Sequence, residues 1–158
     1  MCMALYVGAT EPLATIGWDE SSPAFNVQAV RDLHDPVRRQ FTTPHVYYLG
    51  AHTGCSCGFG YDEVAADSTH DDATDRAAGR RSVALLRAYL TDVVQQLGEV
   101  ELFACWEGDQ GEAPEHKMDV TPDFFGGEAF SLPEKAKFRV RPSSLPLQPT
   151  SDAKTKVE

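Results

Sequence analysis

A helical apolar stripe followed directly by a continuous apolar strand constrains the fold of this chain more than any other feature. The apolar residues recur at steps of three and four, which places them on one face of a helix: Val83, Leu86, Leu90, Val93 and Leu97. Gly98 supplies the left-handed residue that ends such a helix. Segment 99–106, EVELFACW, is apolar after Glu101, which predicts a central strand covered on both sides. Together these elements predict a helix packed on a sheet.

Three further segments are typical of strands: MALYVG at 3–8, FNVQAV at 25–30 and HVYYLG at 45–50. Asp35 and Pro36 favour the start of a short helix, PVRRQF, that ends before residues 42–44. EAFSL and AKFRV, on either side of PEK, predict a hairpin.

The 158 residues match the size of one domain. We therefore expect an α/β (α+β) fold: a single domain over residues 1–141 with a mixed β-sheet, one long packed amphipathic helix and a short helix. Residues 142–158 have the composition of a C-terminal tail.

In KAKFRVR every odd position is basic and every even position is apolar: Lys135, Lys137, Arg139 and Arg141 are the basic members. The favoured interpretation is an edge strand protected from aggregation by its charges. The alternative is an anion-binding face.

The chain is acidic, with 14 basic residues against 24 acidic ones and a net charge of −10. Such a surface repels phosphate backbones and anionic lipid, so we expect neither nucleic acid nor membrane as a partner. No apolar run approaches the ~20 residues of a membrane-spanning helix, and the N-terminal segment lacks the pattern of a signal peptide. We expect a cytoplasmic protein, in which the four cysteines stay reduced. A homodimer, another protein or a small molecule remain open as partners.

The segment LGAHTGCSCGFGYDE, residues 49–63, is the strongest candidate for chemistry. Cys55 and Cys57 are separated only by Ser56 and flanked by Gly54 and Gly58. Glycine lets the backbone fold closely around the sulfurs and expose N–H groups, which stabilise thiolates. The segment follows the strand predicted at 45–50, so it lies at the carboxyl end of a sheet strand, where α/β sheets often bind ligands.

Three hypotheses for this segment stay open. In the first, His52, Cys55 and Cys57 bind a metal such as zinc, and Cys2 completes the set if strand 3–8 neighbours strand 45–50. In the second, the two thiols are redox-active, although the usual spacing of two intervening residues is missing. In the third, the cysteines only build a tight turn in a non-catalytic interaction module or homodimer. Whether the protein is an enzyme is undecided at this point.

Other polar clusters are weaker candidates. His70 with Asp71 and Asp72, and His116 between Glu115 and Asp119, could each bind a divalent cation through imidazole and carboxylate, but such clusters are more typical of solvated surface. Ser68, Thr69 or Asp72 can cap the long helix. Cys105 lies in an apolar strand, which favours a packing role.

MCMALYVGAT and PHVYYLGAHTGCSCGFGYD resemble small uncharacterised bacterial proteins that begin with Met-Cys and carry a Gly-Cys-x-Cys-Gly-Phe loop after an apolar strand. That family has no assigned function, so the resemblance implies no catalytic residue. It does imply that the N-terminal strand and the cysteine loop belong to one structural unit.

Overall fold

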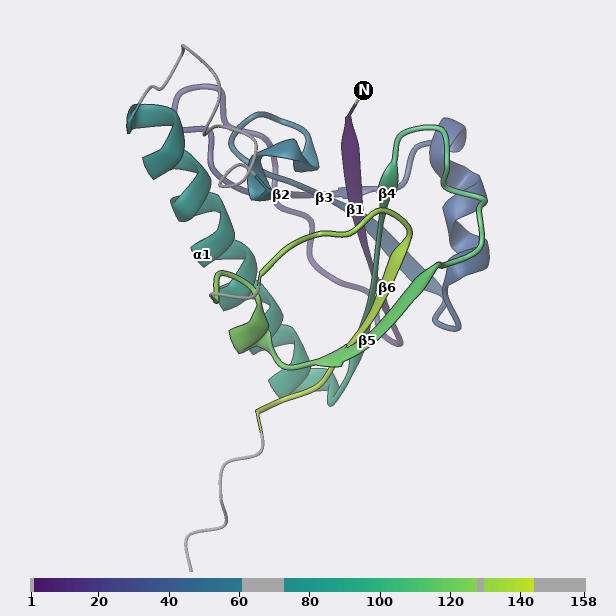
Figure 1. The fold of residues 1–158 in the computed structure, drawn as a ribbon. Coiled ribbons are helices and arrows are strands. Elements are labelled where there is room, and N and C mark those ends of the chain that lie inside the picture. The colour runs from purple at the N-terminus through teal and green to yellow at the C-terminus, as the bar shows by residue number, and fades with distance from the viewer. Residues whose placement is uncertain (1, 61–72, 128–129, 144–158) are drawn as a thin grey trace, which may run out of the picture.

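The computed structural model describes residues 2–60, 73–127 and 130–143, which form a six-stranded mixed sheet with helices on both faces (Figure 1). The strand order is β2-β3-β1-β4-β6-β5, and all neighbours are antiparallel except β5 and β6. The strands are β1 (Met3–Ala9), β2 (Asn26–Ala29), β3 (His45–Gly50), β4 (Val100–Trp106), β5 (His116–Val120) and β6 (Ala136–Val140). The predicted α+β fold with a mixed sheet is confirmed.

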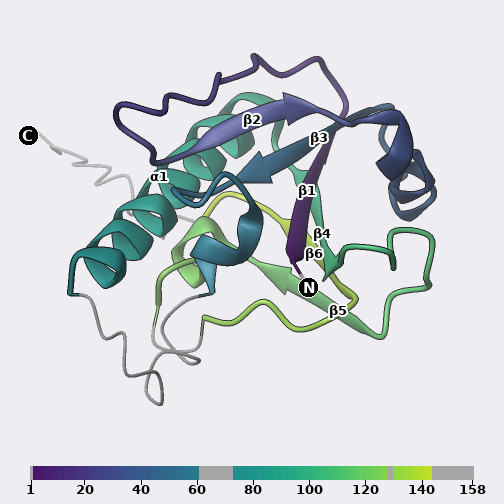
Figure 2. The same ribbon diagram turned by 90° about the horizontal axis from the view of Figure 1, so that it is seen from above.

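Helix α1 (Ala73–Leu97) lies along one face of the sheet, as Figures 1 and 2 both show. Its predicted apolar face is confirmed, because Leu86, Leu90 and Val93 are buried against the strands in the larger core. Gly98 ends the helix with φ +82°, and its N–H donates to the Val94 carbonyl oxygen at 2.8 Å. The caps predicted at 68–72 lie outside the described residues.

The opposite face of the sheet is covered by η1 (Asp32–Gln40), a 3₁₀ helix that takes the place of the predicted short helix. Val37 of η1 is buried in a second, smaller core with Tyr6, Phe103 and Cys105. Strands β1 and β4 are therefore covered on both sides, as expected for β4 from its apolar sequence. Burial raises the pKa of the Cys105 thiol to about 12, which agrees with a packing role.

The predicted hairpin between EAFSL and AKFRV is wrong. Strand β6 pairs with β4 on one side and runs parallel to β5 on the other, with Met118 opposite Phe138. The sequence HKMDV of β5 resembles a loop because its alternate side chains are charged and exposed. Parallel strands are joined by a long crossover connection and not by a tight turn. The sequence between β5 and β6 therefore carries no turn signal that indicates their pairing.

The edge-strand interpretation of the basic row is also wrong, because β6 lies inside the sheet and β5 forms the edge. All four basic side chains form ion pairs with acidic residues of neighbouring segments. Their nitrogen–oxygen distances are 2.7 Å for Lys135–Glu115, 3.3 Å for Lys137–Glu101, 3.3 Å for Arg139–Glu99 and 2.8 Å for Arg141–Glu99. The row thus matches acidic groups on adjacent segments, which the alternation in β6 alone does not reveal.

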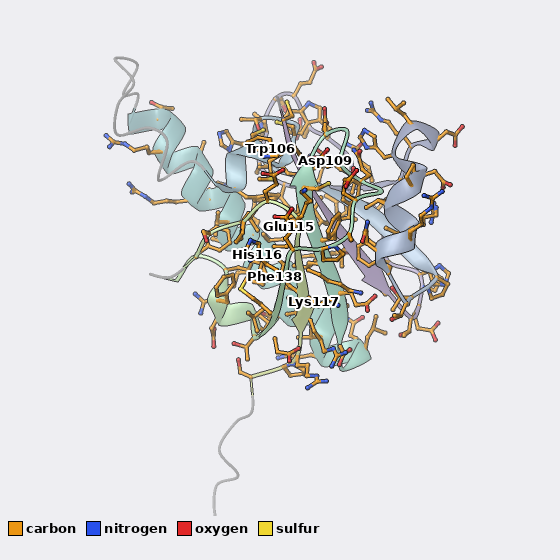
Figure 3. The ribbon with its side chains drawn as sticks, turned by 45° about the vertical axis from the view of Figure 1, so that its right-hand side comes forward. Trp106, Asp109, Glu115, His116, Lys117 and Phe138 are labelled. Atoms are coloured by element: carbon orange, nitrogen blue, oxygen red, sulfur yellow. The ribbon has the colours of Figure 1, made fainter. Side chains whose placement is uncertain are left out.

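The candidate cation cluster around His116 is a row of side chains along β5. Figure 3 places Glu115, His116 and Lys117 near Phe138, below Trp106 at the end of β4 and Asp109 in the loop that follows. Glu115 is held by Lys135, whose ammonium group lowers the pKa of that carboxyl group. The cluster around His70 lies outside the described residues.

Candidate functional site

The sheet topology brings Cys2 to residues 51–60, which we call the cysteine loop. Strands β1 and β3 are antiparallel neighbours, with Leu5 opposite Leu49. The amino end of β1 therefore lies beside the carboxyl end of β3. Cys2 directly precedes β1, and the cysteine loop directly follows β3. This pairing meets the condition on which the inclusion of Cys2 depends.

The cysteine loop begins with a tight turn and continues into the 3₁₀ helix η2 (Ser56–Phe59). The Gly54 N–H donates to the Ala51 carbonyl oxygen at 3.0 Å, and Gly54 adopts φ +81°, where other residues are strained. A Cβ at Gly58 would lie 2.7 Å from both Ala51 Cβ and His52 Nδ1. Glycine at these two positions is thus a requirement of the turn and of close packing.

Ser56, between the two cysteines, fastens the loop to the sheet. Its fully buried hydroxyl donates to the Leu49 carbonyl oxygen at 2.6 Å and accepts from the Leu5 N–H at 2.8 Å. Leu5 and Leu49 are register partners, so the hydroxyl is inserted into the ladder between β1 and β3. The Ser56 N–H donates to the Tyr48 hydroxyl at 3.1 Å. Sequence reasoning missed this residue, since a serine in a loop carries no distinctive signal.

Three thiols meet at this point of the fold. The sulfurs of Cys2, Cys55 and Cys57 all lie within 4.8 Å of one another, and each side chain is half-buried. The Met3 N–H donates to Cys57 Sγ at 3.2 Å. The Cys2 carbonyl oxygen accepts from the Glu107 N–H at 2.8 Å, which anchors the start of β1 to the end of β4. Among the described residues this is the one group of three or more His, Cys, Asp or Glu side chains so placed.

The two loop thiols differ in acidity. Burial opposes ionisation of Cys55, but hydrogen bonds from the Thr53 hydroxyl, the Cys57 N–H and the neighbouring thiols outweigh it and lower the pKa of Cys55. Burial raises the pKa of the Cys57 thiol to about 12, and the adjacent Cys55 adds to this rise. Cys55 is therefore the thiol of the loop that ionises first.

His52 lies outside the cluster of three thiols. Its backbone N–H donates to Ser82 Oγ at 2.9 Å, and its Nδ1 lies 3.2 Å from the same hydroxyl. Ser82 is fully buried in α1 and donates in turn to the Ala24 carbonyl oxygen at 2.7 Å. The structure thus brings together three of the four candidate ligands and places the fourth where it ties the loop to α1.

Comparison with known proteins finds no match for this chain among protein-family models, curated proteins or solved structures. None of the helices in the described ranges is long and apolar enough to cross a membrane. What the site does has to be argued from its own chemistry.

Proposed function

We propose that Cys2, Cys55 and Cys57 form a thiolate centre that binds a thiophilic metal ion, and that zinc is its ion. The observation that carries this proposal is the meeting of three sulfurs from two distant segments within 4.8 Å. Two of these thiols could be neighbours through sequence spacing alone. The third thiol, that of Cys2, is 53 residues from Cys55 and is brought there by the pairing of β1 with β3. This placement by the fold supports a specific binding site.

The dimensions of the group fit a single ion. A tetrahedral zinc with Zn–S bonds of 2.3 Å holds its sulfurs about 3.8 Å apart. Sulfurs within 4.8 Å of one another need to close by no more than about 1 Å to reach this spacing. The three cysteine side chains are only half-buried, so rotation about their side-chain bonds can supply this adjustment.

Three thiolates leave the fourth position of a tetrahedral ion for water or a small ligand. Structural zinc sites usually carry four protein ligands, whereas three protein ligands and one open position are typical of catalytic zinc. His52, held at Ser82, is not in position to supply a fourth ligand with the three sulfurs. The donor set therefore favours a site that exchanges a ligand over a purely structural one. Such a centre needs reduced thiols, which the cytoplasm provides.

Elemental analysis of the protein, purified without chelator, tests the proposal. We expect about one zinc per chain, because thiolate sites hold this ion tightly at neutral pH. Cys55→Ser should lose the ion while its circular dichroism spectrum stays native. Cys105→Ala is the matched control, since Cys105 lies in the other core, and it should keep the ion. A folded wild-type protein that neither contains zinc nor takes it up would refute the proposal and leave the redox and structural-turn hypotheses.

A further inference from the structure

A cavity of about 200 Å³ adjoins the cluster of three thiols, and Cys55 forms part of its wall. Its other walls come from β2, β3, η1 with the residue before it, and the residue after β4. They include Gln28, Arg31, His34, Tyr48 and Glu107. A cavity of about 150 Å³ accommodates benzene, with its six carbon atoms. This cavity is therefore large enough for a ligand of about seven non-hydrogen atoms.

The wall of the cavity includes one cationic and one anionic side chain that form no ion pair with any other described residue. Arg31 and Glu107 both line it, and neither has a salt bridge within 4.0 Å in the described part of the chain. A guanidinium group binds carboxylates in a bidentate fashion, and a carboxylate accepts hydrogen bonds from an ammonium group. The pair therefore matches a ligand that carries both charges.

A hydrogen-bonded network behind the cavity holds His34, one of its lining residues. The Gly108 N–H donates to Gln110 Oε1 at 2.9 Å, which orients the amide so that its Nε2 donates to the Tyr6 hydroxyl at 3.3 Å. That hydroxyl forms a hydrogen bond with His34 Nδ1 at 3.1 Å, in which the tautomer of His34 sets the donor. His34 also packs against Tyr48, with ring centroids 6.3 Å apart. These contacts hold His34 and Tyr48 in place in the wall of the cavity.

We propose that this cavity binds one half of a small disulfide that bears both a carboxylate and an ammonium group, and that Cys55 exchanges with that disulfide. The carboxylate lies at Arg31, the ammonium group at Glu107, and the sulfur at Cys55. One half of such a molecule, with the size of a free amino acid of seven non-hydrogen atoms, matches the volume of the cavity. The inference rests on the three neighbouring thiols of the proposed function, but the exchange needs no bound metal ion.

The exchange has two steps. The Cys55 thiolate attacks one sulfur of the disulfide, whose S–S bond breaks; a mixed disulfide forms on Cys55, and the other half leaves as a thiolate that takes a proton from water. Cys2 or Cys57, within 4.8 Å, then attacks Cys55 Sγ and releases the second half in the same way. The small disulfide gains two electrons and becomes two thiols, while two cysteines become a protein disulfide. Since a disulfide sulfur is no longer a thiolate ligand, oxidation also releases a bound ion.

Three disulfides of different charge test the inference on the protein as purified: L-cystine, whose halves are zwitterionic, cystamine, which is cationic, and 3,3′-dithiodipropionate, which is anionic. Alkylation at timed intervals, followed by peptide mass spectrometry, gives the rate at which Cys55 is oxidised by each. We expect Cys55 to be the first cysteine modified in every case.

Charge variants isolate the role of the cavity, because the reaction rate of each disulfide is compared between the wild-type and the variant protein. Arg31→Gln should slow the reaction of L-cystine and 3,3′-dithiodipropionate by about fivefold, the upper range for an exposed ion pair, and leave cystamine unchanged. Glu107→Gln should slow L-cystine and cystamine and leave 3,3′-dithiodipropionate unchanged. Arg80→Gln and Glu11→Gln make the same changes in net charge at exposed positions that do not line the cavity, and they should leave all three rates unchanged.

Rates that respond to Arg31→Gln and Glu107→Gln no differently from the two controls would overturn the inference, as would first modification of Cys2 or Cys57. Elemental analysis before the disulfide is added keeps the two proposals apart. Zinc-loaded protein without charge selectivity refutes the inference alone, whereas charge-selective exchange by metal-free protein refutes the metal proposal alone.

Discussion

Ser56→Ala removes the hydroxyl that bridges β1 and β3 beside the cluster of three thiols. The Leu5 N–H and the Leu49 carbonyl oxygen both lose their partner, and both belong to fully buried residues. A buried backbone group left unsatisfied costs about 1 to 3 kcal/mol, and partial closure of the two strands recovers some of this. We expect the free energy of unfolding to fall by about 2 to 4 kcal/mol.

Urea denaturation, followed by circular dichroism, measures this loss, and an unchanged m-value shows that the comparison is between the same two states. Zinc content should fall as well, because the cysteines on either side of Ser56 lose their anchor. Ser82→Ala is the matched control: it removes a buried hydroxyl that holds His52 instead. It should cost about 1 to 2 kcal/mol and leave the zinc in place. A Ser56→Ala protein within about 0.5 kcal/mol of wild type and with full zinc content would refute the anchoring argument.

Three further outcomes follow from the packing and from the acidity of the thiols. Leu90→Ala should lower the free energy of unfolding by about 2 to 5 kcal/mol in urea, because it leaves a cavity between α1 and the sheet; a loss below about 1 kcal/mol would contradict that packing. In metal-free protein at pH 8, iodoacetamide should alkylate Cys55 before Cys57, since the pKa of Cys55 is lowered and that of Cys57 is raised to about 12; peptide mass spectrometry gives the order, and the reverse order would contradict it. Gly58→Ala should displace the loop and reduce zinc content in elemental analysis, whereas Gly60→Ala, whose Cβ meets nothing within 4 Å, should not; equal zinc in both variants would contradict the need for close packing at this turn.

The elements that the sequence predicts well are those whose periodicity is set by burial on one face or on both. Helix α1 and strand β4 belong to this class, because Leu86 and Leu90 face one core and β4 is buried along its length up to Cys105. Strand β5 was missed because it is short and its exposed charges resemble a loop. The place of β6 was missed because the acidic partners of its basic row lie on other segments.

At the site, the paired cysteines and their glycines mark the loop, and the inclusion of Cys2 follows only if β1 neighbours β3. Strand order depends on the whole chain, so local sequence patterns do not predict whether β1 and β3 are neighbours. The position of His52 depends on Ser82, thirty residues away in α1, which no local pattern indicates. Arg31 and Glu107 belong to segments 76 residues apart, and only the folded sheet brings them to one cavity.

Cys2 leads into β1, the strand between β3 and β4, so an ion held at the proposed centre is coupled to the middle of the sheet. A ligand that binds only the folded state stabilises it by about 2.7 kcal/mol at a free concentration of 100 Kd. Starvation for the ion would remove that contribution and enlarge the open population that cellular proteases degrade. The abundance of this protein would then rise and fall with the supply of its metal, without any change in the synthesis of the chain.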